Sequence, residues 1–582
     1  MTEARIRWIS GPVLRARTSD TFHVHEAITV GDDSLPGEVI QLAGDEFVAQ
    51  IYEDTTGLKP GQSVQGTGTA LSVRLGPGLL GHIFDGLLRP LEGVAGAFIS
   101  AGVNRGASGR FGFEPTIKVG ERLQAGRRVG TIGGSRSEAL LAPPGMSATV
   151  TWVAAAGEYG ADEHACRFTR VDGTAGSLSL TNSWPVREPR PVANRLPVAG
   201  PMITGQRILD TLFPVARGGR AAVPGGFGTG KTVLQESIAK WCDADIIVYV
   251  GCGERGNEMA EVLDELPKLE DPRTGRRLME RTVIIANTSN MPVAAREASI
   301  YTAITVAEYY RDQGLHVALM ADSTSRWAEA LREVSGRLGE LPSEAGFPAY
   351  LASRLAQFYE RAGRVQTLGG AEGSVTIIGA ISPAAGDFSE PVTMNTRRCV
   401  RSFWALDRER AQARFFPAIN PLLSYSADAD ALAAWWHAEG NPDWLEQRRR
   451  VLELLQAQVH LERMARIVGK DALPPAQQLT LLCAELVNEA VLRQSSYSEV
   501  DRYCSPQRQS AILGIIVRFV DLARAAVDAG VTPDEVAGLP VRVTLQRIGE
   551  EYGEARIAGI GALWQQMEQQ FGALSSEHGH AR

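Results

Sequence analysis

Four glycines within six positions constrain this chain more than any other feature of its sequence. They lie in the stretch AAVPGGFGTGKTVLQE, residues 221–236, between a short apolar run and a good helix former. The four are Gly225, Gly226, Gly228 and Gly230. Glycine lets several backbone N–H groups turn inward toward one anion, and the N-terminus of a following helix adds to the attraction. The sequence therefore predicts a strand over 221–223, a phosphate-binding loop, and a helix over 233–241.

The loop also supplies two side chains with expected contacts to a nucleotide. Its spacing, Gly-x-x-x-x-Gly-Lys-Thr, predicts that Lys231 reaches the β- and γ-phosphates and that the Thr232 hydroxyl ligates Mg²⁺. A flexible glycine loop is the alternative, but the flanking strand and helix favour a nucleotide site. The expected nucleotide-binding residues of the loop are Gly225, Gly226, Phe227, Gly228, Thr229, Gly230, Lys231, Thr232 and Val233.

The composition is that of a soluble protein with several domains. The chain of 582 residues is too long for one hydrophobic core, and its 44% of hydrophobic residues is ordinary for globular proteins. Its net charge of −8 argues against nucleic-acid binding as the main activity. The six cysteines are scattered without metal-ligand spacing, so we expect reduced thiols. The absence of a signal peptide and of long apolar runs predicts a cytoplasmic protein that reaches a membrane only through partners.

The sequence changes character along its length, and these changes predict the domain borders. Short alternating segments come first, the last of them covering 62–75, and glycine-punctuated strands later end at a proline-rich connector. Helical periodicity then dominates the final quarter of the chain. The predicted domains are an N-terminal β-barrel over 1–75, an α/β nucleotide-binding domain over 76–107 and 186–430, an inserted β-rich module over 108–185 and a helical C-terminal domain over 431–582.

Apolar runs alternate with helical segments within the α/β domain. Near-continuous apolar strands separated by helices indicate a parallel sheet that is covered on both faces. After the strand before the phosphate loop, the further expected strands are 246–250, 283–286, 317–320 and 375–380.

Two acidic residues follow strands of this sheet. Asp322 follows the run 317–320 after one intervening residue, where a phosphate-loop enzyme needs a second carboxylate near Mg²⁺. Glu254 and Arg255 come after the run 246–250 on a glycine turn, where a carboxylate can orient the attacking water and an arginine can bind phosphate oxygens. A glutamate in a glycine-rich loop is by itself more often exposed, but its place between the two phosphate motifs favours catalysis. For Glu258, one turn further on, simple exposure stays the interpretation.

Several long motifs together resemble one family. The runs GGFGTGKT, YVGCGERGNEM, GDFSEPVT and FFPAINPLLSYS, with the long segment that begins DSTSRWAEALREVSGRLGELPSEAGF, look like the catalytic A-type chain of the V-type and archaeal-type rotary ATPases. The resemblance covers nearly the whole chain and weakens in the insert and after about residue 505. It implies a RecA-like nucleotide-binding domain, and the insert matches the position of that family's bulge domain.

The resemblance also implies roles for individual residues. Phe416 and Tyr497 match the aromatic residues that sandwich adenine, and Thr232 and Asp322 match those that hold the metal. ATP and ADP are the implied substrates, with Mg²⁺ as cofactor. The implied catalytic residues are Glu254 as the base, Lys231, Arg255 and Arg326.

The implied partners belong to a rotary complex. They are a B-type subunit in an alternating A3B3 ring, which supplies an arginine to the site, and the central-shaft and peripheral-stalk subunits. The membrane is reached only through the ion-translocating sector, and the sequence leaves open both the ion, proton or sodium, and the direction, synthesis or hydrolysis. The alternatives are a non-catalytic subunit of the same ring and a secretion or flagellar export ATPase. An RNA helicase ring is disfavoured by the acidic balance.

Overall fold

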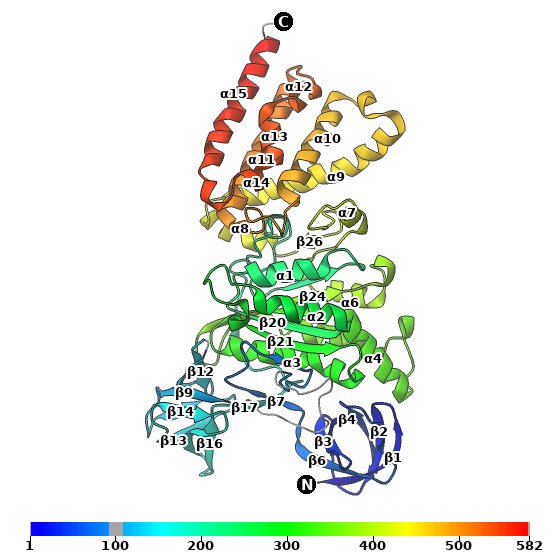
Figure 1. Ribbon diagram of the computed structural model, residues 1–582, viewed down its shortest axis with the longest axis vertical. Helices are drawn as coiled ribbons and strands as arrows, with labels where there is room; N and C mark the ends of the chain where they lie inside the picture. The colour runs from blue at the N-terminus through cyan, green and yellow to red at the C-terminus, as the bar shows by residue number, and fades with distance from the viewer. Residues whose placement is uncertain (1, 92–108, 135, 580–582) are drawn as a thin grey trace.

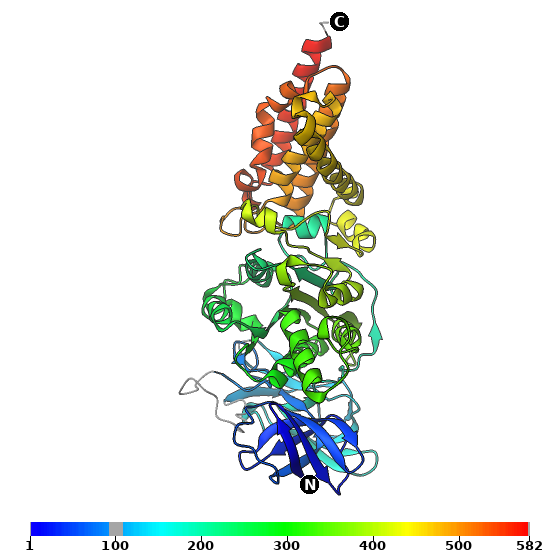
Figure 2. The same ribbon diagram turned by 90° about the vertical axis from the view of Figure 1, so that its right-hand side faces the viewer.

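The molecule is elongated, with its domains stacked along the long axis (Figure 1). The computed structural model describes residues 2–91, 109–134 and 136–579. Two β-rich bodies lie at the end near the N-terminus, an α/β domain lies in the middle, and a helical bundle forms the other end; the view turned by 90° shows the same order (Figure 2). This arrangement confirms the expected multidomain architecture. The segment 92–107, expected to lead into the nucleotide-binding domain, lies outside the described residues.

The first body is a closed barrel of six strands in the order β1-β2-β5-β4-β3-β6, with antiparallel neighbours throughout. Closure leaves no free sheet edge and gathers the apolar side chains in one core. The strands are β1 (Glu3–Ser10), β2 (Val13–Thr18), β3 (Glu26–Val30), β4 (Leu35–Ala43), β5 (Glu46–Ile51) and β6 (Ser63–Ala70).

The expectation of one continuous strand over 62–75 is wrong at its end. The chain leaves the barrel after Ala70, and β7 (Ser72–Leu75) pairs instead with β17 (Asn182–Pro185), more than 100 residues further along the chain. Leu71, between β6 and β7, packs against the core of the α/β domain, so the chain passes from the barrel to the next domain at this residue.

The second body is the inserted module, which is built from two four-stranded sheets. Their orders are β10-β13-β15-β16 and β12-β11-β9-β14, and residues from both sheets form one core between them. The strands are β9 (Arg110–Pro115), β10 (Arg122–Gln124), β11 (Arg128–Ile132), β12 (Glu138–Leu141), β13 (Ser147–Val153), β14 (Gly157–Gly160), β15 (His164–Arg170) and β16 (Ala175–Ser179).

The α/β domain is organised around a sheet in the order β26-β25-β19-β24-β22-β20-β21-β8. Its central strands are parallel, which confirms the expectation. The antiparallel pairs are β25 with β26, β24 with β23 and β23 with β18. The strands are β8 (Ile83–Phe84), β18 (Asn194–Arg195), β19 (Arg220–Pro224), β20 (Ile246–Glu254), β21 (Thr282–Thr288), β22 (His316–Asp322), β23 (Gly363–Gln366), β24 (Glu372–Ile381), β25 (Ser402–Phe403) and β26 (Tyr425–Ser426).

Helices cover both faces of this sheet. Along β20 the side chains alternate: Ile247 and Tyr249 join the core under α1 and α2, whereas Val248 and Val250 join the core under the helices of the other face. The helices of the domain are α1 (Lys231–Trp241), α2 (Gly256–Glu265), α3 (Val293–Asp312), α4 (Thr324–Leu338), α5 (Leu351–Tyr359), α6 (Pro391–Cys399) and α7 (Arg408–Gln412).

The C-terminal domain is helical, as the periodicity predicts. Four of its helices begin with proline, whose fixed φ suits the first turn of a helix. None of the helices in the described part of the chain combines the length and the apolar character needed to cross a membrane. The helices are α8 (Ala429–Ala438), α9 (Trp444–Val468), α10 (Pro475–Val487), α11 (Pro506–Asp528), α12 (Pro533–Ala537), α13 (Pro540–Gln546), α14 (Ile548–Glu551) and α15 (Gly559–Gly579).

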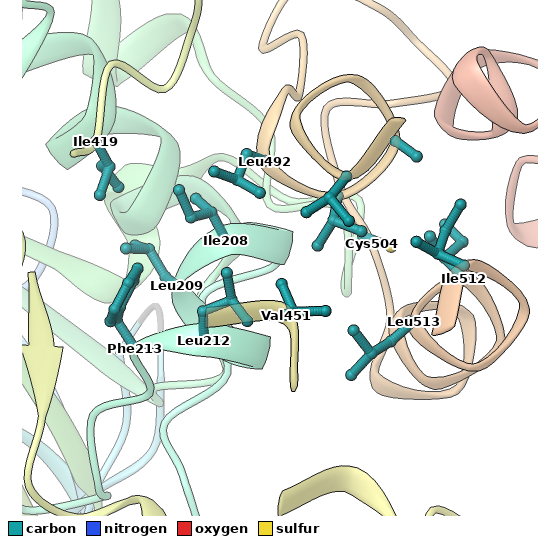
Figure 3. Packing of buried hydrophobic residues seen from close by; sticks show 14 of the residues in the cluster. Ile208, Leu209, Leu212, Phe213, Ile419, Val451, Leu492, Cys504, Ile512 and Leu513 are labelled. Carbon is teal, nitrogen blue, oxygen red and sulfur yellow. The ribbon is translucent and has the colours of Figure 1, made fainter. Parts of the chain in front are cut away.

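One hydrophobic core joins the α/β domain to the helical bundle. Figure 3 shows Leu209 and Leu212, from the short helix η1 (Ile208–Leu212) of the α/β domain, near Val451 of α9 and Leu513 of α11. All of these side chains are buried and belong to the same cluster. The two domains are therefore held by packed side chains as well as by the chain that connects them.

Candidate active site

The phosphate loop has the strand–loop–helix form that its sequence predicts. It runs from β19 into α1, and Gly228 and Gly230 adopt φ values of 75° and 82°, which favour glycine. Gly225 is required for a different reason, because a Cβ atom there would lie 2.6 Å from the Thr229 hydroxyl oxygen. That hydroxyl donates a hydrogen bond of 2.8 Å to the Gly226 carbonyl, which ties the loop to itself. The first backbone N–H groups of α1, which a helix cannot pair internally, lie where the loop ends and can bind an anion there.

Lys231 lies between two oxygen atoms at the carboxyl edge of the sheet. Its Nζ donates a hydrogen bond to the Ser382 hydroxyl and lies 3.2 Å from Oδ1 of Asp322. Asp322 ends β22, as expected, and is 3% exposed. Its Oδ1 is buried and has no hydrogen-bond partner in the described residues, so the contact with Lys231 is an ion pair without hydrogen-bond geometry.

Glu254 ends the neighbouring strand β20, and here the expected glycine turn is wrong. The strand continues to Glu254 through a bulge, because Gly253 takes a φ of 75° and the register with β21 shifts between Cys252 and Glu254. Glu254 is buried, and its Oε1 has no hydrogen-bond partner among the residues that the structure describes. Burial, and then the charge of Asp322, raise the pKa of Glu254 to about 7.

Both arginines expected near the γ-phosphate are engaged within the chain. The Arg255 guanidinium lies over the Phe227 ring of the phosphate loop, 5.3 Å from its centroid, and 3.9 Å from a carboxylate oxygen of Glu258. Arg326, in the first turn of α4, forms an ion pair of 3.0 Å with Glu329. Glu258 is only partly exposed, so the expectation of simple exposure does not hold for it.

A cavity of about 280 Å³ lies beside the loop and is lined by residues from four parts of the chain. Phe416 is 42% exposed and Tyr497 is 89% exposed, and both line this cavity with loop residues such as Gly230. The structure thus brings together the loop and the two aromatic residues expected at adenine. The further lining residues are Gln206, Gly228, Val233, Leu234, Leu406, Arg414, Pro417, Ala418, Arg493, Gln494, Ser495 and Ser496.

The residues present fit a magnesium ion that is shared with phosphate. In the described ranges, no group of three or more His, Cys, Asp or Glu side chains is placed to hold a metal by itself. Thr232 is the second residue of α1, next to Lys231, and Asp322 offers a buried oxygen that accepts no hydrogen bond from the described residues. Hydroxyl and carboxylate oxygens are the ligands that Mg²⁺ prefers, with phosphate oxygens completing the set.

Two polar residues at this edge of the sheet are not predicted from the sequence. Ser382 directly follows β24, so the rule that ligands meet at the carboxyl ends of parallel strands could have found it. Tyr249 lies in the middle of an apolar strand, yet its hydroxyl contacts Asp322. Tyr249 opens the motif YVGCGERGNEM, but nothing in that motif indicates a contact of its hydroxyl with Asp322.

Comparison with protein families assigns each domain of the chain. Residues 205–426 match the nucleotide-binding domain of the ATP synthase alpha/beta family, and 433–537 match the C-terminal domain of V and A type ATP synthase. Residues 6–68 match the beta-barrel domain of the ATP synthase alpha/beta family, and 106–187 match the ATP synthase alpha/beta subunit barrel-sandwich domain.

Full-length relatives are also found. The A subunit of the A-type ATP synthase of Desulfurococcus sp. (strain SY) is 50% identical over 585 residues, covering 99% of this chain and 100% of the relative. The corresponding protein of Methanopyrus kandleri is 50% identical over 579 residues, covering 98% of each chain. Among solved structures, the assembled ATPase EscN from the type III secretion system of enteropathogenic E. coli matches with a TM-score of 0.64 and 24% identity, covering 88% of this chain and 100% of that one. This structural match concerns the fold alone.

Proposed function

The chain belongs to the family of A-type ATP synthase catalytic chains, and on that premise we propose that it interconverts ATP with ADP and phosphate at the phosphate loop. The observation that carries the proposal is the meeting of Lys231, Asp322 and Glu254 at the carboxyl ends of adjacent parallel strands. Adenine is assigned to the cavity between Phe416 and Tyr497. The likeness to a secretion ATPase rests on 24% identity, whereas the A-type relatives reach 50% over almost the whole chain.

Glu254 is assigned the role of general base. In hydrolysis a water molecule attacks the γ-phosphorus, its proton passes to Glu254, and the bond between the γ-phosphorus and the bridging oxygen of ADP breaks. A carboxylate with a pKa of about 7 can accept this proton near neutral pH and can return it in the direction of synthesis. The buried Oε1 atom, which has no hydrogen-bond partner in the described residues, is available to a water molecule.

The positive groups of the site are assigned to the phosphates. Lys231 exchanges its contacts with Ser382 and Asp322 for the β- and γ-phosphate oxygens, and the N–H groups of the loop bind the same anion. Arg255 and Arg326 leave their carboxylate partners to stabilise the charge that develops on the γ-phosphate. Thr232 and Asp322 would hold Mg²⁺, which supplies charge neutralisation on the phosphates when bound.

The proposed setting is a rotary complex. We place the chain in an alternating A3B3 ring with a B-type subunit, with central-shaft and peripheral-stalk subunits, on the cytoplasmic side of a membrane that it meets only through the ion-translocating sector. The outward exposure of Phe227 and Tyr497, at 84% and 89%, supports a site that a neighbouring subunit completes. An arginine from that neighbour would act on the γ-phosphate.

The substitution Glu254→Gln tests the assignment of the base. In a complex of this chain with its B-type partner, we expect near-normal binding of Mg-ATP and turnover lower by roughly 10²- to 10⁴-fold, because only the proton acceptor is lost. Equilibrium binding of a fluorescent ATP analogue and steady-state hydrolysis are the two measurements. Glu261→Gln, on the exposed side of α2, is the matched control and should leave both unchanged. A Glu254→Gln variant that turns over like the parent would show that another group is the base.

A further inference from the structure

A buried tyrosine lies directly behind the candidate metal site. Tyr249 is in the middle of β20, is 1% exposed, and its side chain joins the core under α1 and α2. Its hydroxyl lies 3.2 Å from Oδ2 of Asp322. In the parallel register Tyr249 is opposite Met320 and Gly251 is opposite Asp322, so the phenol extends along the strand to reach the carboxylate.

The direction of this hydrogen bond follows from the charges. An ionised carboxylate can only accept, so the phenol donates. If Tyr249 served only to fill the core, its aromatic ring would be enough. A buried hydroxyl without a hydrogen-bond partner would then cost free energy.

The two oxygens of Asp322 have different surroundings. Oδ2 accepts the hydrogen bond from Tyr249, whereas Oδ1 faces Lys231 at 3.2 Å without hydrogen-bond geometry. We propose that Tyr249 is a positioning residue, which fixes Asp322 by one oxygen so that the other is presented to the magnesium–nucleotide complex. This inference rests on the proposed function, because it requires ATP and Mg²⁺ at the loop.

The experiment measures how much Mg²⁺ strengthens nucleotide binding. A fluorescent ATP analogue is titrated into the full chain with Mg²⁺ and, separately, with EDTA, and the ratio of the two affinities is compared between the parent and Tyr249→Phe. We expect this ratio to fall by about tenfold in the variant, the loss typical of a hydrogen bond to a charged group, with little change in EDTA. The phenylalanine ring keeps the core filled, and thermal unfolding of the variant checks this.

Two further variants separate positioning from packing. Tyr310 is equally buried, on the other face of the sheet, and its hydroxyl has no hydrogen-bond partner in the described part of the chain, so Tyr310→Phe should leave the ratio unchanged. In an Asp322→Asn background, Tyr249→Phe should have no further effect, because a residue that acts through a carboxylate loses its effect with that carboxylate.

The outcomes are distinct. A parent-like ratio in Tyr249→Phe, an equal loss of affinity in Mg²⁺ and in EDTA, or a full effect that persists with Asp322→Asn would each overturn the proposal and leave Tyr249 a residue of the core. A parent chain that binds no nucleotide in either condition would overturn the proposed function first.

Discussion

Two buried carboxylates, Glu254 and Asp322, lie beside one lysine at the end of the parallel sheet, and their different surroundings give them different properties. Asp322 has the Lys231 ammonium at 3.2 Å from one carboxylate oxygen and accepts a hydrogen bond from Tyr249 on the other. Glu254 has a buried oxygen without a hydrogen-bond partner in the described residues, and burial followed by the charge of Asp322 raises its pKa to about 7. The residue placed to exchange a proton near neutral pH is therefore Glu254.

The raised pKa of Glu254 predicts the pH dependence of the reaction. A base must be deprotonated, so activity is present above the pKa and is lost as the pH falls through it. We expect kcat/KM for ATP in the assembled complex to fall with a midpoint near pH 7, whereas an ordinary glutamate would place the midpoint near 4.5. Steady-state hydrolysis between pH 5 and pH 9 measures this. The residual activity of Glu254→Gln should not fall with this midpoint. If it does, a group other than Glu254 causes the loss of activity at low pH.

At the scale of elements, the loop that carries Tyr497 is anchored by a buried ion pair. Asp501 forms this ion pair with Arg207, beside η1 in the α/β domain, and accepts a hydrogen bond of 3.1 Å from the Ser495 N–H. The Arg207 N–H donates in turn to the side chain of Gln494 at 2.7 Å. The wall of the adenine cavity is therefore held by the same contacts that join the two domains.

Removal of the Asp501 charge should weaken both stability and binding. Asp501→Asn leaves the buried Arg207 without its counter-ion, and breaking a buried pair in this way costs about 3–5 kcal/mol. Urea unfolding of the chain measures the stability, and titration with the ATP analogue should show lower affinity because the Tyr497 loop loses its anchor. Asp521→Asn, which breaks the more exposed pair with Arg450, is the control and should cost about 1 kcal/mol or less. Equal stability of the two variants would contradict the anchoring role.

Local signals in the sequence predict much of the fold and part of the site. The strand, loop and helix around Lys231 are adjacent in the chain, and the apolar runs predict β22 and β24 because a buried parallel strand is apolar throughout. The bulge at Gly253 is not predictable in this way, because it depends on the register with β21. The approach of Tyr497 to the loop follows only from the family resemblance, since the two are far apart in the sequence. Tyr249 lies in a recognised motif, but the contact of its hydroxyl with Asp322 joins two strands and has no local signal.

At the scale of the whole molecule, the candidate site lies where the α/β domain meets the helical bundle. The barrel and the inserted module lie toward the opposite end of the long axis (Figure 1). Because the cavity is lined by both the phosphate loop and residues 493–497, a nucleotide bound there would contact both sides of the joint between the two domains. The shared core around Leu212 and Leu513 connects this part of the α/β domain to the helical bundle through packed side chains. Such a position suits a protein that links nucleotide chemistry to movement of its helical end.

The central claim, that this chain is the catalytic component of a two-component ring, is tested most directly by turnover with and without the B-type subunit. The purified chain, confirmed as a monomer by sedimentation, is assayed for Mg-dependent ATP hydrolysis alone and after mixing with that partner. We expect low activity alone and a rise of about 10³- to 10⁵-fold on complex formation, the usual effect of an arginine supplied in trans. Full activity of the monomer, unchanged by the partner, would contradict the claim and indicate a self-contained ATPase.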